Sequence, residues 1–280
     1  MKIRIWGCRG SLASPGPDTV KYGGNTSCVE VWTSSGDRII FDAGTGIRAL
    51  GDHIGSRPEK PIHLLLTHLH LDHIEGLGFF APIWAPDIEL HIWGPPSSQA
   101  SLEENLSHSF APPVFPVNLH EVPSHPIFHD VFDETCEFGS ACVTAVYVKH
   151  KGPTVGYRIE DEGKVFVYMP DHEPSVNGIV EDESIKWPSG LDLAANADVL
   201  FHDCQYFDEQ YPARQGWGHS SVSMAVDFSV RVGAKRFVMF HHDPAHTDSQ
   251  VKELGKQAAK LCRESSGSVE PGYEGMEIEL

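Results

Sequence analysis

The stretch that decides the fold is Pro61-Ile-His-Leu-Leu-Leu-Thr-His68-Leu-His70-Leu-Asp72-His73-Ile-Glu-Gly-Leu77. Its mainly apolar run, 62–66, has the length of a buried strand, and four metal-capable side chains follow within the next seven residues. Side chains two apart in an extended chain share a face, so His68 and His70 can grip one ion. Asp72 and His73 fall where the chain turns toward a helix, and there they can face a second ion about 3.5–4 Å away. A histidine-rich loop without metal is the alternative interpretation.

The H-x-H-x-D-H pattern at 68–73 resembles the signature of the metallo-β-lactamase superfamily. This resemblance implies an α/β fold of the αββα metallo-β-lactamase type. In such a sandwich two facing mixed β-sheets are flanked by helices, and the metal ions lie at one edge of the sheets. Strand and helix patterns alternate in both halves of the chain, which suits two similar layers that face each other.

Length and composition favour a single domain. The 280 residues contain nothing that resembles a linker, so we expect one domain over 1–280 with a lid-like insertion at about 95–130. The apolar runs are far shorter than a membrane span. Residues 1–6 alternate like a strand and lack the apolar region of a signal peptide. These features predict a cytoplasmic protein without a membrane partner.

Net charge bears on the partners. The formal charge of −18 disfavours a broad nucleic-acid footprint, because affinity for long polyanions comes from clustered lysine and arginine. A small substrate and no extended nucleic-acid surface are therefore expected. Prolines and aromatic residues in 110–117 predict a lid or a subunit contact, and a loop that merely packs on the body is the alternative. The aromatic lid and the acidic surface make a homodimer the expected assembly.

Two residues near the amino terminus have open roles. The Gly- and Pro-rich loop 9–17 is typical of a structural turn, although Arg9 could instead meet an anionic substrate. Asp42 ends a predicted strand at 38–41. It could cap the next helix, 47–53, or orient a ligating imidazole, and both roles could hold at once.

Other strand ends supply the further ligands that the resemblance implies. Apolar strands end at His150, Asp171 and His241, where the superfamily has its third histidine, its bridging acid and its last histidine. Neighbouring strand residues point to opposite sides, so only one of His241 and His242 is expected to ligate. We choose His241 because it directly follows the apolar strand. The implied ligands are His68, His70 and His150 for the first ion and Asp72, His73 and His241 for the second, with Asp171 bridging.

The expected cofactors are two divalent metal ions. Imidazole and carboxylate ligands suit zinc, which we expect, and also manganese and iron(II) as alternatives. Two such cations outweigh the negative charge of Asp72, Asp171 and a bridging hydroxide by about one unit. A monoanionic phosphodiester would neutralise that charge, and the metals would make hydroxide available at neutral pH.

Three segments of the carboxyl-terminal half indicate a branch of the family. Met169-Pro-Asp171, Phe201-His-Asp203 and Gly218-His219-Ser220-Ser221 resemble the ribonuclease Z-like branch of phosphodiesterases. In that branch a histidine at the position of His219 assists departure of the leaving oxygen. The resemblance implies that a bridging hydroxide attacks phosphorus, that His219 is the general acid and that Asp72 orients the nucleophile. The alternative for His219 is a residue beside the N-cap of a predicted helix at 220–232.

The substrate prediction rests on what this chain lacks. Ribonuclease Z proper carries a basic, glycine-rich arm for transfer RNA, and we find no such arm in the sequence. Residues 6–11 and 22–27 resemble stand-alone hydrolases of small diesters. The predicted substrate is therefore a small anionic phosphodiester, with a 3′,5′-cyclic nucleotide as the first choice. The alternatives are a tRNA 3′-processing endonuclease of ribonuclease Z type, a non-phosphodiester metallo-hydrolase, and a metal-bound sensor or redox protein.

Overall fold

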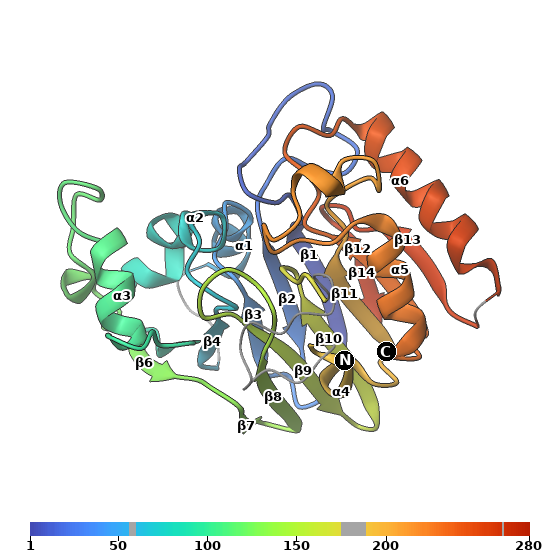
Figure 1. The fold of residues 1–280 in the computed structure, drawn as a ribbon. Coiled ribbons are helices and arrows are strands. Elements are labelled where there is room, and N and C mark those ends of the chain that lie inside the picture. The colour runs from blue at the N-terminus through green and yellow to red at the C-terminus, as the bar shows by residue number, and fades with distance from the viewer. Residues whose placement is uncertain (56–59, 175–188, 265) are drawn as a thin grey trace.

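The computed structural model describes residues 1–55, 60–174, 189–264 and 266–280. Two seven-stranded mixed sheets face each other (Figure 1). The first has the order β14-β1-β2-β3-β4-β5-β6, with β14 Glu277–Glu279, β1 Lys2–Gly7, β2 Cys28–Trp32, β3 Arg38–Phe41, β4 Ile62–Leu65, β5 Leu90–Gly94 and β6 Ile127–Asp130. The second has the order β13-β12-β11-β10-β9-β8-β7, with β13 Ser268–Pro271, β12 Arg236–Phe240, β11 Val199–Asp203, β10 Lys164–Met169, β9 Val155–Asp161, β8 Ala141–Tyr147 and β7 Glu134–Phe138.

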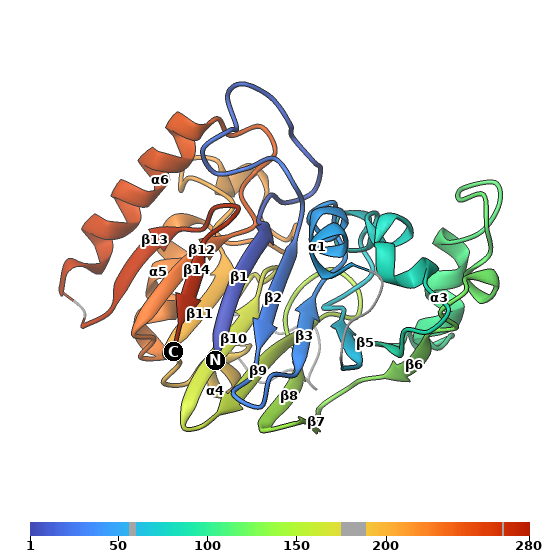
Figure 2. The ribbon, with the colours of Figure 1, turned by 180° about the vertical axis from the view of Figure 1, so that it is seen from behind.

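Helices cover the outer faces of both sheets, as seen from the two sides in Figures 1 and 2. Those beside the first sheet are α1 Gly46–Ile54, α2 Leu71–Ile74 and α3 Leu102–Ser109, with short 3₁₀ turns at Leu77–Phe79, Ala81–Trp84 and Leu119–Glu121. Those beside the second are α4 Leu191–Ala194, α5 Val222–Arg231 and α6 Asp248–Leu261, with 3₁₀ turns at Tyr211–Ala213 and Cys262–Glu264. The predicted two-sheet sandwich is confirmed.

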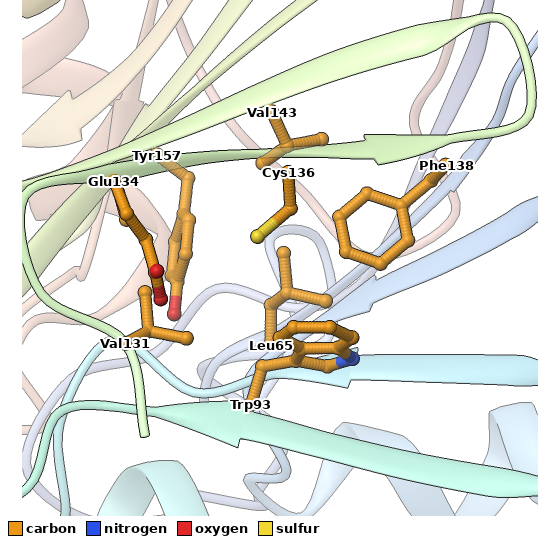
Figure 3. A pocket seen from close by; sticks show the side chains of 9 residues that line it. Leu65, Trp93, Val131, Glu134, Cys136, Phe138, Val143 and Tyr157 are labelled. Atoms are coloured by element: carbon orange, nitrogen blue, oxygen red, sulfur yellow. The ribbon is translucent and has the colours of Figure 1, made fainter. Parts of the chain in front are cut away.

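The main core lies between the sheets, because each strand there turns alternate apolar side chains inward. In β1 the buried residues are Ile3, Ile5 and Gly7, while Lys2, Arg4 and Trp6 are half-buried. Figure 3 shows a small pocket in this core where β4 and β5 meet the strands of the second sheet. Apolar side chains make up most of its lining: Leu65, Trp93, Val131, Phe138, Val143, Ala145 and Tyr157.

The carboxyl ends of several strands meet at one edge of the sandwich. Strands β10, β11 and β12 run parallel, and β8 runs in the same direction because β9 is antiparallel to both β8 and β10. The Val155 N–H donates to the Thr67 carbonyl across the sheets. This bond joins the start of β9 to the residue before His68. The ends of β4, β8, β10, β11 and β12 therefore lie side by side, which is where the predicted ligands follow.

The segment 110–117 packs on the outer core of the first sheet. Phe110 is buried, and its ring lies 4.2 Å from that of Phe115, while Val114 is 72% exposed. Closure of this segment over the site, the single-domain boundary and the homodimer stay predictions. In the ranges that the structure describes, no helix has both the length and the apolar character needed to cross a bilayer.

Glu30 on β2 provides a test of the fold by pH. Its buried carboxylate accepts from Trp6 Nε1 at 2.9 Å and lies 3.1 Å from Arg38 Nε, and burial raises its pKa to about 7. A carboxyl group whose pKa is higher in the folded state contributes stability at low pH, and this contribution is lost as the pH rises toward 7. We expect the melting temperature of Glu30→Gln, relative to that of the wild type, to be higher at pH 8 than at pH 5. A difference in melting temperature that stays constant across this range would contradict the assigned pKa.

Candidate functional site

Three imidazoles form a first cluster at the shared sheet edge. His68 and His70 follow β4, and His150 follows β8. His70 Nδ1 lies 2.9 Å from His68 Nε2 and 3.2 Å from His150 Nε2. A ring nitrogen carries either one proton or one lone pair, so a shared cation satisfies this convergence better than mutual hydrogen bonds do. Burial lowers the pKa of all three rings, that of His150 to about 4, which favours the neutral form that binds metal.

A second cluster lies next to the first and joins α2 to the end of β12. Asp72 Oδ2 lies 3.3 Å from His73 Nε2 and 3.1 Å from His241 Nε2. Burial raises the pKa of Asp72, but His73 and His241 outweigh burial and hold the pKa well below its usual value. The Asp72 carboxylate is therefore ionised and available to a cation.

Asp171, directly after Pro170 at the end of β10, reaches both clusters. Its Oδ2 lies 3.0 Å from His73 Nε2, and its Oδ1 lies 3.3 Å from His241 Nε2 and 3.6 Å from His150 Nε2. His73 Nε2 and Asp171 Oδ2 are both buried without a hydrogen bond of acceptable geometry. Such buried polar atoms are costly unless another group satisfies them. The donor set of nitrogen and carboxylate oxygen thus fits divalent metal ions.

Asp42 fixes one of these imidazoles from behind. Its Oδ2 accepts from His73 Nδ1 at 2.8 Å and from the Tyr168 hydroxyl at 2.9 Å, and its Oδ1 accepts from the Thr67 N–H at 2.8 Å. Of the two predicted roles, the structure thus shows the one in orienting an imidazole. The capping role was wrong, because the residue before α1 is Thr45. Asp42 has a φ of 59°, a left-handed conformation that is often kept at functional sites.

The two adjacent histidines, His241 and His242, differ in their contacts. His241 has a φ of 58° and faces Asp72 and Asp171, whereas His242 Nε2 donates to the Gly272 carbonyl away from the clusters. A side chain on Gly10 would place a Cβ only 2.3 Å from His241 Nδ1. Gly10 in the 9–17 loop is therefore needed for the close approach of the backbone to the His241 ring.

Arg9 has a structural role. The side chain is fully buried, and its guanidinium donates to the carbonyls of Gly23, Asp243 and His246. These bonds tie the amino-terminal loop to the segment that follows His241. The alternative role of Arg9, contact with an anionic substrate, was wrong, because backbone carbonyls surround the guanidinium.

His219 lies between the two clusters. Its ring is 5.0 Å from that of His150 and stacks at 4.9 Å on that of His241. Nδ1 lies 2.7 Å from Asp203 Oδ2. Burial lowers the pKa of His219, but Asp203 outweighs burial and raises it to about 9. Asp203 therefore favours the protonated ring and holds Nδ1, and Nε2 is left as the nitrogen that can give a proton.

Sequence reasoning gave no role to two carboxylates that the structure brings to this site. Asp203 ends β11 and holds His219, and its position after an apolar strand was the available signal. Glu173 follows Asp171 by two residues and is 1% exposed.

The alternative that placed His219 merely beside a helix cap is partly right, since Ser221 is the residue before α5, but the Ser221 hydroxyl donates to Asp208.

Comparisons with known proteins agree with this architecture. The family model described as "Beta-lactamase superfamily domain" matches residues 37–242. The chain is 23% identical over 268 residues to ribonuclease Z of Bacillus velezensis. This match covers 81% of this chain and 84% of that protein. Among solved structures, the metallo-beta-lactamase fold protein YhfI from Bacillus subtilis has a TM-score of 0.73 at 19% identity, with 100% of this chain and 98% of that chain covered. The short form of human tRNase Z has a TM-score of 0.68 at 20% identity, with 100% and 99% covered.

One prediction about partners was wrong. The absence of an extended nucleic-acid surface was inferred from net charge, but the relatives are ribonucleases and a similar structure is a tRNase. Net charge sums over the whole chain and does not report the charge around one site. In the sequence Lys149 and Lys151 flank His150, a local run of positive charge that the total for the chain does not reveal.

The comparisons and the geometry indicate the same family of proteins. The family model covers most of the chain. The two facing sheets and the clustered imidazoles and carboxylates agree with it. The prediction of a metal-dependent phosphodiester hydrolase is confirmed at the level of enzyme class. The chain belongs to the beta-lactamase superfamily, whose domain model it matches over residues 37–242.

Proposed function

We propose that the chain is a binuclear metal-dependent phosphodiesterase that cleaves RNA. The observation that carries the proposal is the convergence of seven ligand-type side chains from both sheets, with the Asp171 carboxylate reaching both clusters. His68, His70 and His150 would hold one ion, Asp72, His73 and His241 the other, and Asp171 both. Zinc is the proposed metal.

Divalent ions bound there would supply positive charge for phosphoryl oxygens and make water more acidic. The residues of the chain provide the rest. The Ser11 N–H donates to Asp72 Oδ2 at 2.7 Å, which fixes a carboxylate that would orient the attacking water. His219, held by Asp203, would donate a proton to the departing oxygen. Asp42 keeps the His73 ring in the orientation that aims Nε2 at Asp72 and Asp171.

The substrate class is inferred from relatives and local charge. The ribonuclease Z relatives and the lysines that flank His150 support an RNA substrate. Nucleic-acid affinity depends on such local cations rather than on total charge. A 3′,5′-cyclic nucleotide, the first choice from the sequence, stays a prediction that the same experiment tests.

The test combines metal analysis with a panel of diesters. Purified protein should contain two equivalents of metal. It should hydrolyse bis(p-nitrophenyl) phosphate and cleave a precursor transfer RNA more efficiently than it opens 3′,5′-cyclic AMP. Metal-loaded protein that hydrolyses none of these diesters would refute the proposed function. Preferential opening of the cyclic nucleotide would refute RNA as the substrate.

Replacement of Asp42 by asparagine should weaken metal binding. All the groups that face the Asp42 carboxylate are donors, so an amide nitrogen there would oppose one of them and release the His73 ring. Removing a residue that orients a ligand costs about 10–100-fold in metal affinity. We expect a loss of this size in titrations against a competing chelator. Tyr168→Phe removes one donor and keeps the carboxylate, so this variant should lose less metal affinity than Asp42→Asn. Equal metal affinity of Asp42→Asn and wild type would show that His73 needs no such support.

A further inference from the structure

Glu173 lies outside both metal clusters but contacts the segment that borders them. Its buried carboxylate accepts three hydrogen bonds: from the Tyr211 hydroxyl at 2.6 Å, from the Gly216 N–H at 2.8 Å and from the Gly218 N–H at 2.8 Å. All three donors belong to the loop 211–218, which leads into His219. A buried carboxylate therefore holds this loop at fixed points against the end of β10.

The same residue is linked to His150 through two neighbours, Lys149 and Gly218. The backbone N–H of Glu173 donates to the Lys149 carbonyl at 3.0 Å. The Gly218 carbonyl, on the residue whose N–H Glu173 binds, accepts from His150 Nδ1 at 2.7 Å. These bonds form a closed ring from Glu173 through Gly218 and His150 back to Lys149. A ligating imidazole needs such a partner on its second nitrogen to keep its orientation and tautomer.

The approach of Gly218 to the ring is too close for a side chain. A Cβ at this glycine would lie 2.3 Å from His150 Nδ1, and the residue has a φ of 97°. The carbonyl that orients His150 therefore lies on a flexible residue type, which by itself would not keep that carbonyl in place. The Glu173 carboxylate supplies the constraint, because it binds the N–H of the same residue.

We propose that Glu173 is a positioning residue that sets the orientation of His150 through the loop 211–218. The inference rests on the proposed function, because it concerns the first metal cluster. Glu173 does not touch the clusters itself. It acts on metal binding at His68, His70 and His150, and leaves the cluster of Asp72, His73 and His241 with its own support from Asp42.

The experiment measures the affinities of both sites for cobalt(II) by its absorption spectrum and by competition with a chelator. In Glu173→Gln the amide nitrogen faces an N–H donor of the loop, so the Gly218 carbonyl is released. We expect one of the two sites to lose about 10–100-fold in affinity and to change its spectrum. The site that is retained should match the one retained in His150→Ala.

A matched control comes from another buried carboxylate. Asp161, at the far end of β9, is 2% exposed and accepts from the Ser34 N–H, the Ser34 hydroxyl and the Ser140 hydroxyl. It lies about 20 Å along the strand from the edge where Val155 meets Thr67. Asp161→Asn should keep both cobalt affinities and the spectrum even if its melting temperature falls. This separates a positioning effect from a general loss of stability.

Two results with Glu173→Gln would overturn the inference. One is unchanged cobalt affinity and spectrum in Glu173→Gln, and the other is an equal loss at both sites. If Glu173→Gln does not fold, Tyr211→Phe deletes one of the three donors and should produce a smaller loss at the same site; an unchanged site there would also refute the inference. Wild-type protein that binds no divalent ion would instead refute the proposed function.

Discussion

Replacement of His70 by alanine is expected to abolish metal binding at the first cluster, and turnover with it. His70 Nδ1 is the nitrogen that both His68 Nε2 and His150 Nε2 approach, so its removal takes away the centre of the first cluster. The loss of affinity should exceed the about 10–100-fold that follows removal of a residue that only supports a ligand. Metal content after gel filtration and hydrolysis of bis(p-nitrophenyl) phosphate measure the two effects.

The control for this variant is His120→Ala. His120 is exposed in the 3₁₀ turn Leu119–Glu121, away from the strand ends that carry the clusters. It should keep the metal content and rate of the wild type. A His70→Ala protein that retains two equivalents of metal and full turnover would contradict the role of the first cluster.

Replacement of His219 by alanine should separate chemistry from metal binding. The ring lies against His150 and His241, but its Nδ1 is bonded to Asp203, so its loss leaves all seven proposed ligands in place. Loss of a general acid typically costs about 10²–10⁴ in rate. We expect a fall of this size in kcat for substrates with an alkoxide leaving group, at unchanged metal content.

The leaving group provides the control for His219. A p-nitrophenolate anion is stable enough to depart without a proton, so bis(p-nitrophenyl) phosphate should lose far less rate than an RNA substrate in the same variant. The rate on RNA should also fall above the pKa of His219, which bound cations would bring below its value of about 9. Equal losses on both substrates would indicate that His219 acts on something other than the leaving oxygen.

Sequence reasoning worked where a functional group follows an apolar strand. His68, His70, Asp72 and His73 are close in the chain, and the spacing of a strand end already brings them to one edge. His150, Asp171 and His241 come from remote segments, but each follows the end of a strand of the second sheet. The structure brings all seven together, and their role as ligands stays a prediction.

Other parts of the site depend on contacts that no sequence pattern shows. Glu173 binds backbone N–H groups of a loop some forty residues away, and backbone donors are the same at every position. Asp42 was assigned two roles because its choice of partner depends on Tyr168 and His73, which only the packed sheets bring near. Net charge failed as a guide to the partner for the same reason, since it carries no information on position.

Each cluster draws its members from both sheets. His68 and His70 come from the first sheet and His150 from the second, while Asp72 and His73 come from the first and His241 from the second. Neither half of the chain can therefore assemble either cluster alone. A chain cut between β6 and β7 would yield two fragments, and their association could be followed by the return of metal binding. The site would thus report how the two layers dock.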